Sequence, residues 1–61
     1  MPIVQIEMLK GRTVEQKRAL VKEITDSMVR TVNCKREAVR VIIREMEQEN
    51  LGIGDKLWID L

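Results

Sequence analysis

The 61-residue sequence has no histidine, phenylalanine or tyrosine, and it has one cysteine, Cys34, and one tryptophan, Trp58. Without histidine there is no imidazole for a catalytic triad, and a lone thiol cannot close a tetrahedral zinc shell. One cysteine also excludes a disulfide within the chain. Glycine is scarce, and no glycine-rich nucleotide loop is present. The sequence therefore predicts no metal, no cofactor and a cytoplasmic location, where thiols stay reduced.

Charge of one sign is also lacking, since 11 Lys and Arg oppose 10 Asp and Glu, a formal charge of +1. Such a chain has no general electrostatic attraction to nucleic acid or to an anionic membrane. No apolar run approaches the ~20 residues that span a bilayer. The N-terminal residues lack the basic region of a signal peptide. We expect neither nucleic acid nor a membrane as a partner.

The chain is short, yet 44% of its residues are hydrophobic. A domain of about 60 residues buries only about 60% of the surface that its unfolded chain exposes. Disulfides and metals are excluded as additional supports, so association remains. We therefore expect a homo-oligomer.

The first part of the chain has two clear patterns. Residues 2–9 alternate in polarity and are rich in β-branched side chains, which predicts a strand that Pro2 opens. Gly11 then suits a turn with positive φ. Apolar residues recur every four positions over residues 14–32, which predicts an amphipathic helix. Thr13 and Gln16 have the spacing of a capping box at its start, and Asn33 suits a left-handed stop.

Residues 38–46 fit two structures. Their alternation suits a strand, whereas the spacing of Val39, Ile42, Ile43 and Met46 suits a helix, and the β-branched content favours the strand. A strand, a helix and a second strand form a β-α-β unit with a parallel pair. Residues 51–55 indicate a turn or short hairpin, and the apolar tail 56–61 is expected to pack on a neighbouring subunit. The prediction is one α+β domain over 1–61.

Chemistry can be expected at Pro2 and at the arginines. Excision of Met1 would leave Pro2 with a free secondary amine, and arginine cations with an apolar pocket would lower its pKa toward neutrality. Such an amine can accept and return a proton. Alternatively, Pro2 only opens an edge strand. Arg12, just before the helix, could bind a carboxylate together with the first helical amides or lie solvated in a loop. Arg40 interrupts an apolar strand, so it has either a functional role or a structural partner. Arg44 shares its face, and either arginine could pair with Glu7 or Glu45.

Together these segments resemble the 4-oxalocrotonate tautomerase family, the 2-hydroxymuconate tautomerases. The resemblance is carried by Pro2-Ile-Val-Gln-Ile, Leu9-Lys-Gly-Arg-Thr and Glu15-Gln16-Lys17, and further on by Val39-Arg-Val-Ile-Ile-Arg-Glu-Met46 and Gly52-Ile-Gly54. It implies a β-α-β subunit in a hexamer, a trimer of dimers, with sites built from more than one chain.

The resemblance also implies roles. Pro2 would be the general base that moves a proton of a 2-hydroxydienoate to C5, with Arg40 stabilising charge near the dienol oxygen. Arg12 would bind the distal carboxylate of a small dicarboxylate substrate involved in aromatic hydrocarbon catabolism. Leu51 stands where the family usually has an aromatic residue, so it keeps the pocket wall apolar without a ring.

Two other classes fit parts of the sequence. If residues 36–49 formed a helix, the order strand, helix, helix would match a ribbon-helix-helix DNA-binding dimer, although neither strand face is basic. A non-catalytic or partner subunit of the tautomerase fold is the other alternative.

Overall fold

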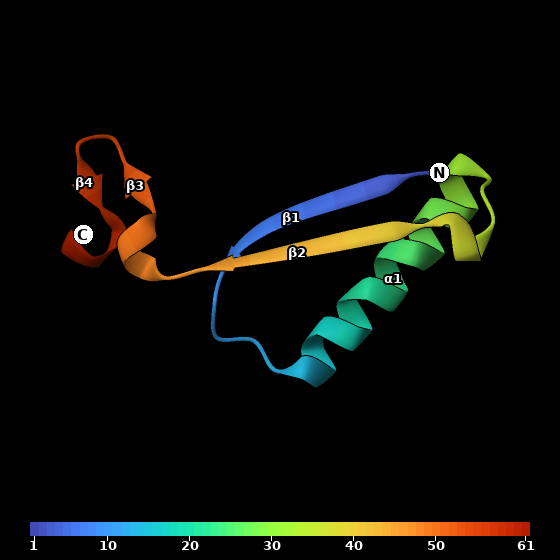
Figure 1. The fold of residues 1–61 in the computed structure, drawn as a ribbon, viewed down its shortest axis with the longest axis horizontal. Helices are drawn as coiled ribbons and strands as arrows, with labels where there is room; N and C mark the ends of the chain where they lie inside the picture. Colours follow the sequence, from blue (N-terminus) through green and yellow to red (C-terminus); the bar gives the residue numbers. More distant parts are fainter.

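The protein is described as a computed structural model that covers all of residues 1–61, and it is built around one β-α-β unit (Figure 1). Strand β1 is Ile3–Leu9, helix α1 is Val14–Val32 and strand β2 is Arg40–Met46. Two short strands follow as an antiparallel hairpin, β3 (Gly52–Ile53) and β4 (Lys56–Leu57). Single 3-10 turns occupy Arg36–Ala38, Gln48–Asn50 and Trp58–Asp60.

Strands β1 and β2 are parallel, with Ile3 opposite Arg40 and Leu9 opposite Met46. The strand reading of residues 38–46 is therefore confirmed, except that β2 begins at Arg40 because the chain turns just before it. The helical alternative for residues 36–49 is wrong, and with it the ribbon-helix-helix plan. The predicted hairpin is confirmed as β3 and β4.

The ends of α1 follow the sequence closely. The Thr13 hydroxyl accepts a hydrogen bond from the Gln16 amide at 3.1 Å, and the Gln16 side chain accepts one from the Thr13 amide at 2.9 Å. This reciprocal pair is the predicted capping box. Asn33 ends the helix in the left-handed region with φ 60°, and Gly11 has φ 128° in the turn before the helix. Both local predictions are confirmed.

One face of the strand pair is turned toward α1 and is half-buried, whereas the other face is largely exposed. On the face toward α1, the half-buried strand residues are Val4, Ile6, Met8, Val41 and Ile43. On α1 their counterparts are Leu20, Val21, Ile24 and Met28. Not one residue of the single chain is fully buried, so this layer is an incomplete core.

The chain is extended for its size. Its radius of gyration is 14.7 Å, against about 10.5 Å for a compact domain of this length. Its accessible surface is 4940 Å², against about 4,100 Å² for a globular protein of 7.1 kDa. Figure 1 shows why, because β3 and β4 lie apart from the β-α-β unit beyond the end of β2. No helix of the chain combines the length and the apolar character that a membrane crossing needs.

Candidate active site

Pro2 and the start of β2 meet at one end of the strand pair. The Arg40 amide donates a hydrogen bond to the Pro2 carbonyl at 2.9 Å, which continues the parallel ladder one residue beyond β1. Pro2 itself is half-buried, whereas Met1 before it is 76% exposed. The ring of Pro2 is thus fixed by its own backbone, while the residue that blocks its nitrogen projects into solvent.

The apolar neighbours of Arg40 in the sequence suggested a place in the interior of a strand. Arg40 lies instead at the first position of β2. Its guanidinium is exposed and donates to the Glu37 carbonyl at 2.7 Å, with no carboxylate partner. Arg44 forms the structural pair that the sequence allowed, at 3.5 Å from Glu7. Arg40 and Arg44 both lie on the face of the strand pair that α1 leaves uncovered, and only the guanidinium of Arg40 is without a counter-ion.

Arg12 lies at the other end of the strands, in the turn between β1 and α1. It borders a hollow of about 240 Å³ whose lining is Met8, Arg12, Gln16, Lys17 and Leu20. No hydrogen bond or ion pair involves the Arg12 guanidinium. The predicted help from the helical amides is reduced, because the Thr13 hydroxyl already accepts from the Gln16 amide. An anion at this hollow would depend chiefly on the Arg12 cation.

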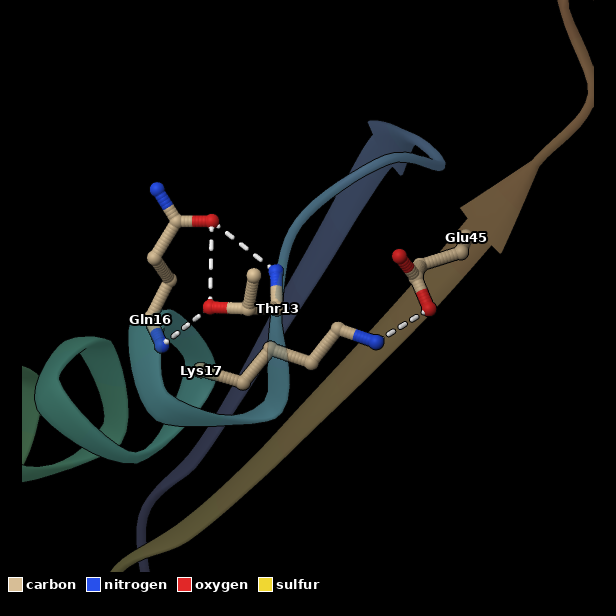
Figure 2. A network of polar contacts seen from close by, with 4 residues as sticks. All are labelled: Thr13, Gln16, Lys17 and Glu45. Atoms are coloured by element: carbon tan, nitrogen blue, oxygen red, sulfur yellow. Dashed lines mark hydrogen bonds and ion pairs between the residues drawn. The ribbon is translucent and has the colours of Figure 1, made fainter.

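A second cation at the same hollow is already paired. The Lys17 ammonium, from the first turn of α1, contacts the Glu45 carboxylate of β2 (Figure 2). Both side chains are only 28% exposed, the lowest pair of values among the ion pairs of the chain. This contact joins α1 to β2 beside Arg12.

Leu51 follows the end of β2 and is half-buried at the base of the hairpin. Its carbonyl accepts a hydrogen bond from the Trp58 amide at 2.8 Å, which ties the tail back to this point. Leu51 therefore lies at the Arg12 end of the strands and not at the Pro2 end.

The four predicted site residues are thus divided between the two ends of one chain. Residues Ile3 and Leu9 are six strand steps apart, which is about 20 Å. Neither Pro2 nor Arg40 lines a hollow of the single chain. A single copy brings Pro2 close to Arg40 and Arg12 to the end that carries Leu51, but it does not bring the two pairs together.

Ion pairs near Arg12 were not predicted, because Glu45, Glu47 and Glu49 look in the sequence like a solvated charge run. Glu45 instead belongs to β2 and contacts Lys17, while Glu47 lies 2.6 Å from Lys10. The hydrogen bond to Glu47 and the attraction of its charge raise the pKa of Lys10. A usable signal was present, because Lys17 falls on the apolar stripe of the helix and Glu45 shares the inward parity of the strand.

A second network of ion pairs lies on the charged face of α1. Asp26 accepts from Lys22 at 2.9 Å and from Arg36 at 2.6 Å, so its second partner comes from the turn before β2. These two hydrogen bonds lower the pKa of Asp26.

Comparison with known proteins agrees with this architecture. A family model described as "Tautomerase enzyme" matches residues 2–60. A 2-hydroxymuconate tautomerase of Pseudomonas putida is 46% identical over 54 residues, which cover 88% of this chain and 86% of the relative. A "Probable tautomerase" of Halalkalibacterium halodurans is 39% identical over 56 residues, covering 92% of each chain.

The solved structures agree as well. A structure from a study of 4-oxalocrotonate tautomerase isozymes of Methylibium petroleiphilum superposes with a TM-score of 0.90 at 39% identity, covering 97% of this chain and 92% of that one. Fold and sequence together define a tautomerase, an enzyme of the isomerase class. The chain belongs to the 4-oxalocrotonate tautomerase family.

Proposed function

We propose that the protein converts a 2-hydroxymuconate-type dienol to the conjugated 2-oxo-3-enedioate, with the amine of Pro2 as general base. The base removes the proton of the 2-hydroxyl group, the electron pairs shift along the diene, and a proton is delivered at C5. Atoms and charge balance without a cofactor. The observation that carries the proposal is the fixed position of Pro2 beside Arg40, with the Arg40 amide 2.9 Å from the Pro2 carbonyl.

The amine becomes available when Met1 is removed. In the full chain the Pro2 nitrogen is an amide with no useful basicity, so excision is a requirement of the mechanism. Met1 is 76% exposed, and no side-chain hydrogen bond or ion pair holds it, which is consistent with easy removal. A free amine near arginine cations and an apolar wall has a lowered pKa, as proton transfer at neutral pH requires.

Two arginines without counter-ions, Arg12 and Arg40, take the two anionic ends of the substrate. Arg40 stabilises the charge that develops on the oxygen at C2 together with the adjacent carboxylate. Arg12 binds the distal carboxylate, and Leu51 supplies apolar wall. Support for this division comes from the charges themselves, since the guanidinium groups of Arg18, Arg36 and Arg44 each contact a carboxylate, whereas those of Arg12 and Arg40 do not. Arg30 is also unpaired, but it lies on the helix face that carries Glu23 and Asp26.

The site is shared between copies of the chain, assembled as a hexamer that is a trimer of dimers. A single chain holds Pro2 and Arg12 at opposite ends of β1, so another copy running in the opposite direction is needed to bring the two together. The exposed face and edges of the strand pair are available to it, with Ile3 53% and Ile42 38% exposed. The excess surface of the single chain, about 800 Å², equals what one partner buries in a standard interface.

The same reasoning gives a setting for the reaction. Dienols of this kind arise where aromatic rings are cleaved, and the proposed role is in aromatic hydrocarbon catabolism in the cytoplasm.

The test is ultraviolet-monitored ketonisation of 2-hydroxymuconate by protein whose intact mass shows that it begins at Pro2. Pro2→Ala should lower kcat at least about a hundredfold, the scale of a lost general base. Arg40→Ala should lower kcat by a similar factor, the scale of a lost oxyanion donor. Arg30→Ala is the matched control, because Arg30 is also exposed and makes no ion pair but lies on the helix face that carries Glu23 and Asp26.

The outcomes separate the possibilities. Turnover that survives Pro2→Ala, or that is equal in protein retaining Met1, would rule out the proline base. A folded oligomer with no turnover above buffer would favour the non-catalytic or partner subunit over the enzyme.

A further inference from the structure

The turn that carries Arg12 is attached to β2 on both of its sides. Before Arg12, the Lys10 amide donates to the Met46 carbonyl at 3.0 Å, and the Lys10 ammonium lies 2.6 Å from Glu47. After Arg12, the capping box fixes Thr13, and Lys17 contacts Glu45. Two lysines on either side of Arg12 are therefore paired with the two glutamates on either side of Met46.

The two attachments differ in burial. Lys10 and Glu47 are 61% and 52% exposed, so water and salt screen their attraction. Lys17 and Glu45 are each 28% exposed, and Lys17 lines the same hollow as Arg12. Figure 2 shows the Lys17 side chain reaching across from the helix start to the strand, close to the capping box. The less exposed pair is thus the less screened one, and it lies beside Arg12 at the hollow.

Pairing also decides which cation is available to a ligand. Glu45 neutralises Lys17, whereas no acidic group contacts Arg12. The hollow between them therefore has one uncompensated positive charge, on a backbone held at both ends. A carboxylate bound there does not have to order the turn first, and this preorganisation is what makes such a contact strong.

We propose that the ion pair between Lys17 and Glu45 positions Arg12 for binding the distal carboxylate of the substrate. Lys17 is a positioning residue in this scheme and does not touch the substrate. The inference rests on the proposed function, because it assumes that Arg12 receives that carboxylate. In this scheme Lys17 and Glu45 contribute to the preference for dicarboxylates over monocarboxylates through their effect on Arg12.

Binding of two unreactive probes tests the inference without relying on turnover. Trans,trans-muconate carries both carboxylates, whereas sorbate has a methyl group in place of the distal one. Calorimetric dissociation constants for both are measured on the assembled protein. For Lys17→Met, which keeps the aliphatic stem, we expect the Kd of muconate to rise about tenfold and that of sorbate less than twofold. The charge exchange Lys17→Glu/Glu45→Lys should restore muconate binding.

Glu45→Gln separates positioning from direct contact. If Lys17 itself bound the carboxylate, releasing it from Glu45 would tighten muconate binding. If the pair positions Arg12, the same change weakens it. Lys22→Met is the matched control, since Lys22 lies on the same helix and pairs with Asp26 at 72% exposure, and it should leave both probes unaffected.

Several results would overturn the inference. One is an equal loss of muconate and sorbate binding, which a general structural role would produce, and another is unchanged muconate binding in a folded variant. Should Lys17→Met fail to fold, Glu45→Gln and the charge exchange decide the question. Arg12→Gln is measured in parallel. If Arg12→Gln leaves the preference for muconate over sorbate intact, the proposed role of Arg12 is wrong and the inference is overturned with it. If Arg12→Gln removes that preference but the variants of Lys17 and Glu45 do not change it, only the inference is overturned.

Discussion

Activity should be recovered by mixing two defective chains, because Pro2 and Arg12 cannot meet within one copy. The six strand steps between Ile3 and Leu9 span about 20 Å, and Pro2 and Arg12 lie beyond both. The carboxyl carbons of a six-carbon dienedioate are roughly 6 Å apart. A substrate that touches both residues must therefore touch two chains.

The perturbation is a pair of variants, Pro2→Ala and Arg12→Gln, each assembled alone and then co-refolded in equal amounts. Alone, every site lacks either the base or the distal cation. In random mixed oligomers, about a quarter of the sites receive Pro2 from one variant and Arg12 from the other. At low substrate, where kcat/KM is measured, we expect about a quarter of the wild-type rate from the mixture.

The assay needs the equal mixture and both parents at the same total chain concentration. Mixing without unfolding controls for contamination by active protein and should give no recovery until subunits exchange. If co-refolded oligomers, shown by mass to contain both variants, are no more active than the better parent, then Pro2 and Arg12 act within one chain. The reasoning from strand length would then be refuted.

Four further predictions concern assembly and stability. Ile42→Lys puts a cation on the uncovered strand face, where Ile42 is 38% exposed. Sedimentation should show that the dissociation constant of the oligomer rises at least about tenfold, and an unchanged oligomer would contradict this. Thr13→Ala removes the N-cap and should lower the free energy of unfolding by about 1 kcal/mol per chain in denaturant titrations. An unchanged free energy of unfolding would mean that the cap does not form. Gly11→Ala should cost at least about 1 kcal/mol although no atom crowds the site, because φ is 128°, and a neutral result would mean that the turn relaxes. The two cation partners of Asp26 lower its pKa, so its contribution to folding stability is present above the ordinary carboxyl pKa and is lost as pH falls through the lower pKa of the folded state. The Asp26→Asn variant should therefore be less stable than the wild type at neutral pH, and thermal melts should show this difference shrinking below about pH 4. A difference that does not change with pH would contradict the ion pairs.

Local signals made most of the fold predictable. The capping box at Thr13, the positive φ of Gly11 and the left-handed Asn33 are properties of one to four neighbouring residues, and each was confirmed. The parallel pair followed from two β-branched strands separated by a helix, since that order requires a crossover connection. The sequence did not predict that β2 begins at Arg40, because a 3-10 turn ends at Ala38, where the strand was expected to start.

Contacts between distant residues were less accessible. Three glutamates at alternate positions look like a solvated run, although the alternation of the strand turns Glu45 toward the helix. The parallel register is what places Arg44 opposite Glu7 across the strands. Pro2, Arg12 and Arg40 were singled out from the residues themselves and Leu51 by resemblance to a family, and both approaches suggest roles without positions in space. Their division between two ends of the chain depends on strand length and direction, and these are properties of the folded unit.

That division links stability to activity. A chain with no fully buried residue has an incomplete core, and the strands that leave it open hold Pro2 at one end and lead to Arg12 at the other. In the proposed assembly, the contact that covers apolar side chains such as Ile3 and Ile42 also brings the base of one copy to the distal cation of another. Specific activity should therefore fall on dilution together with the oligomer, at concentrations where the remaining chains still contain helix. Catalysis and the core then depend on the same surface, and a substitution on the uncovered strand face affects both even when it lies far from the substrate.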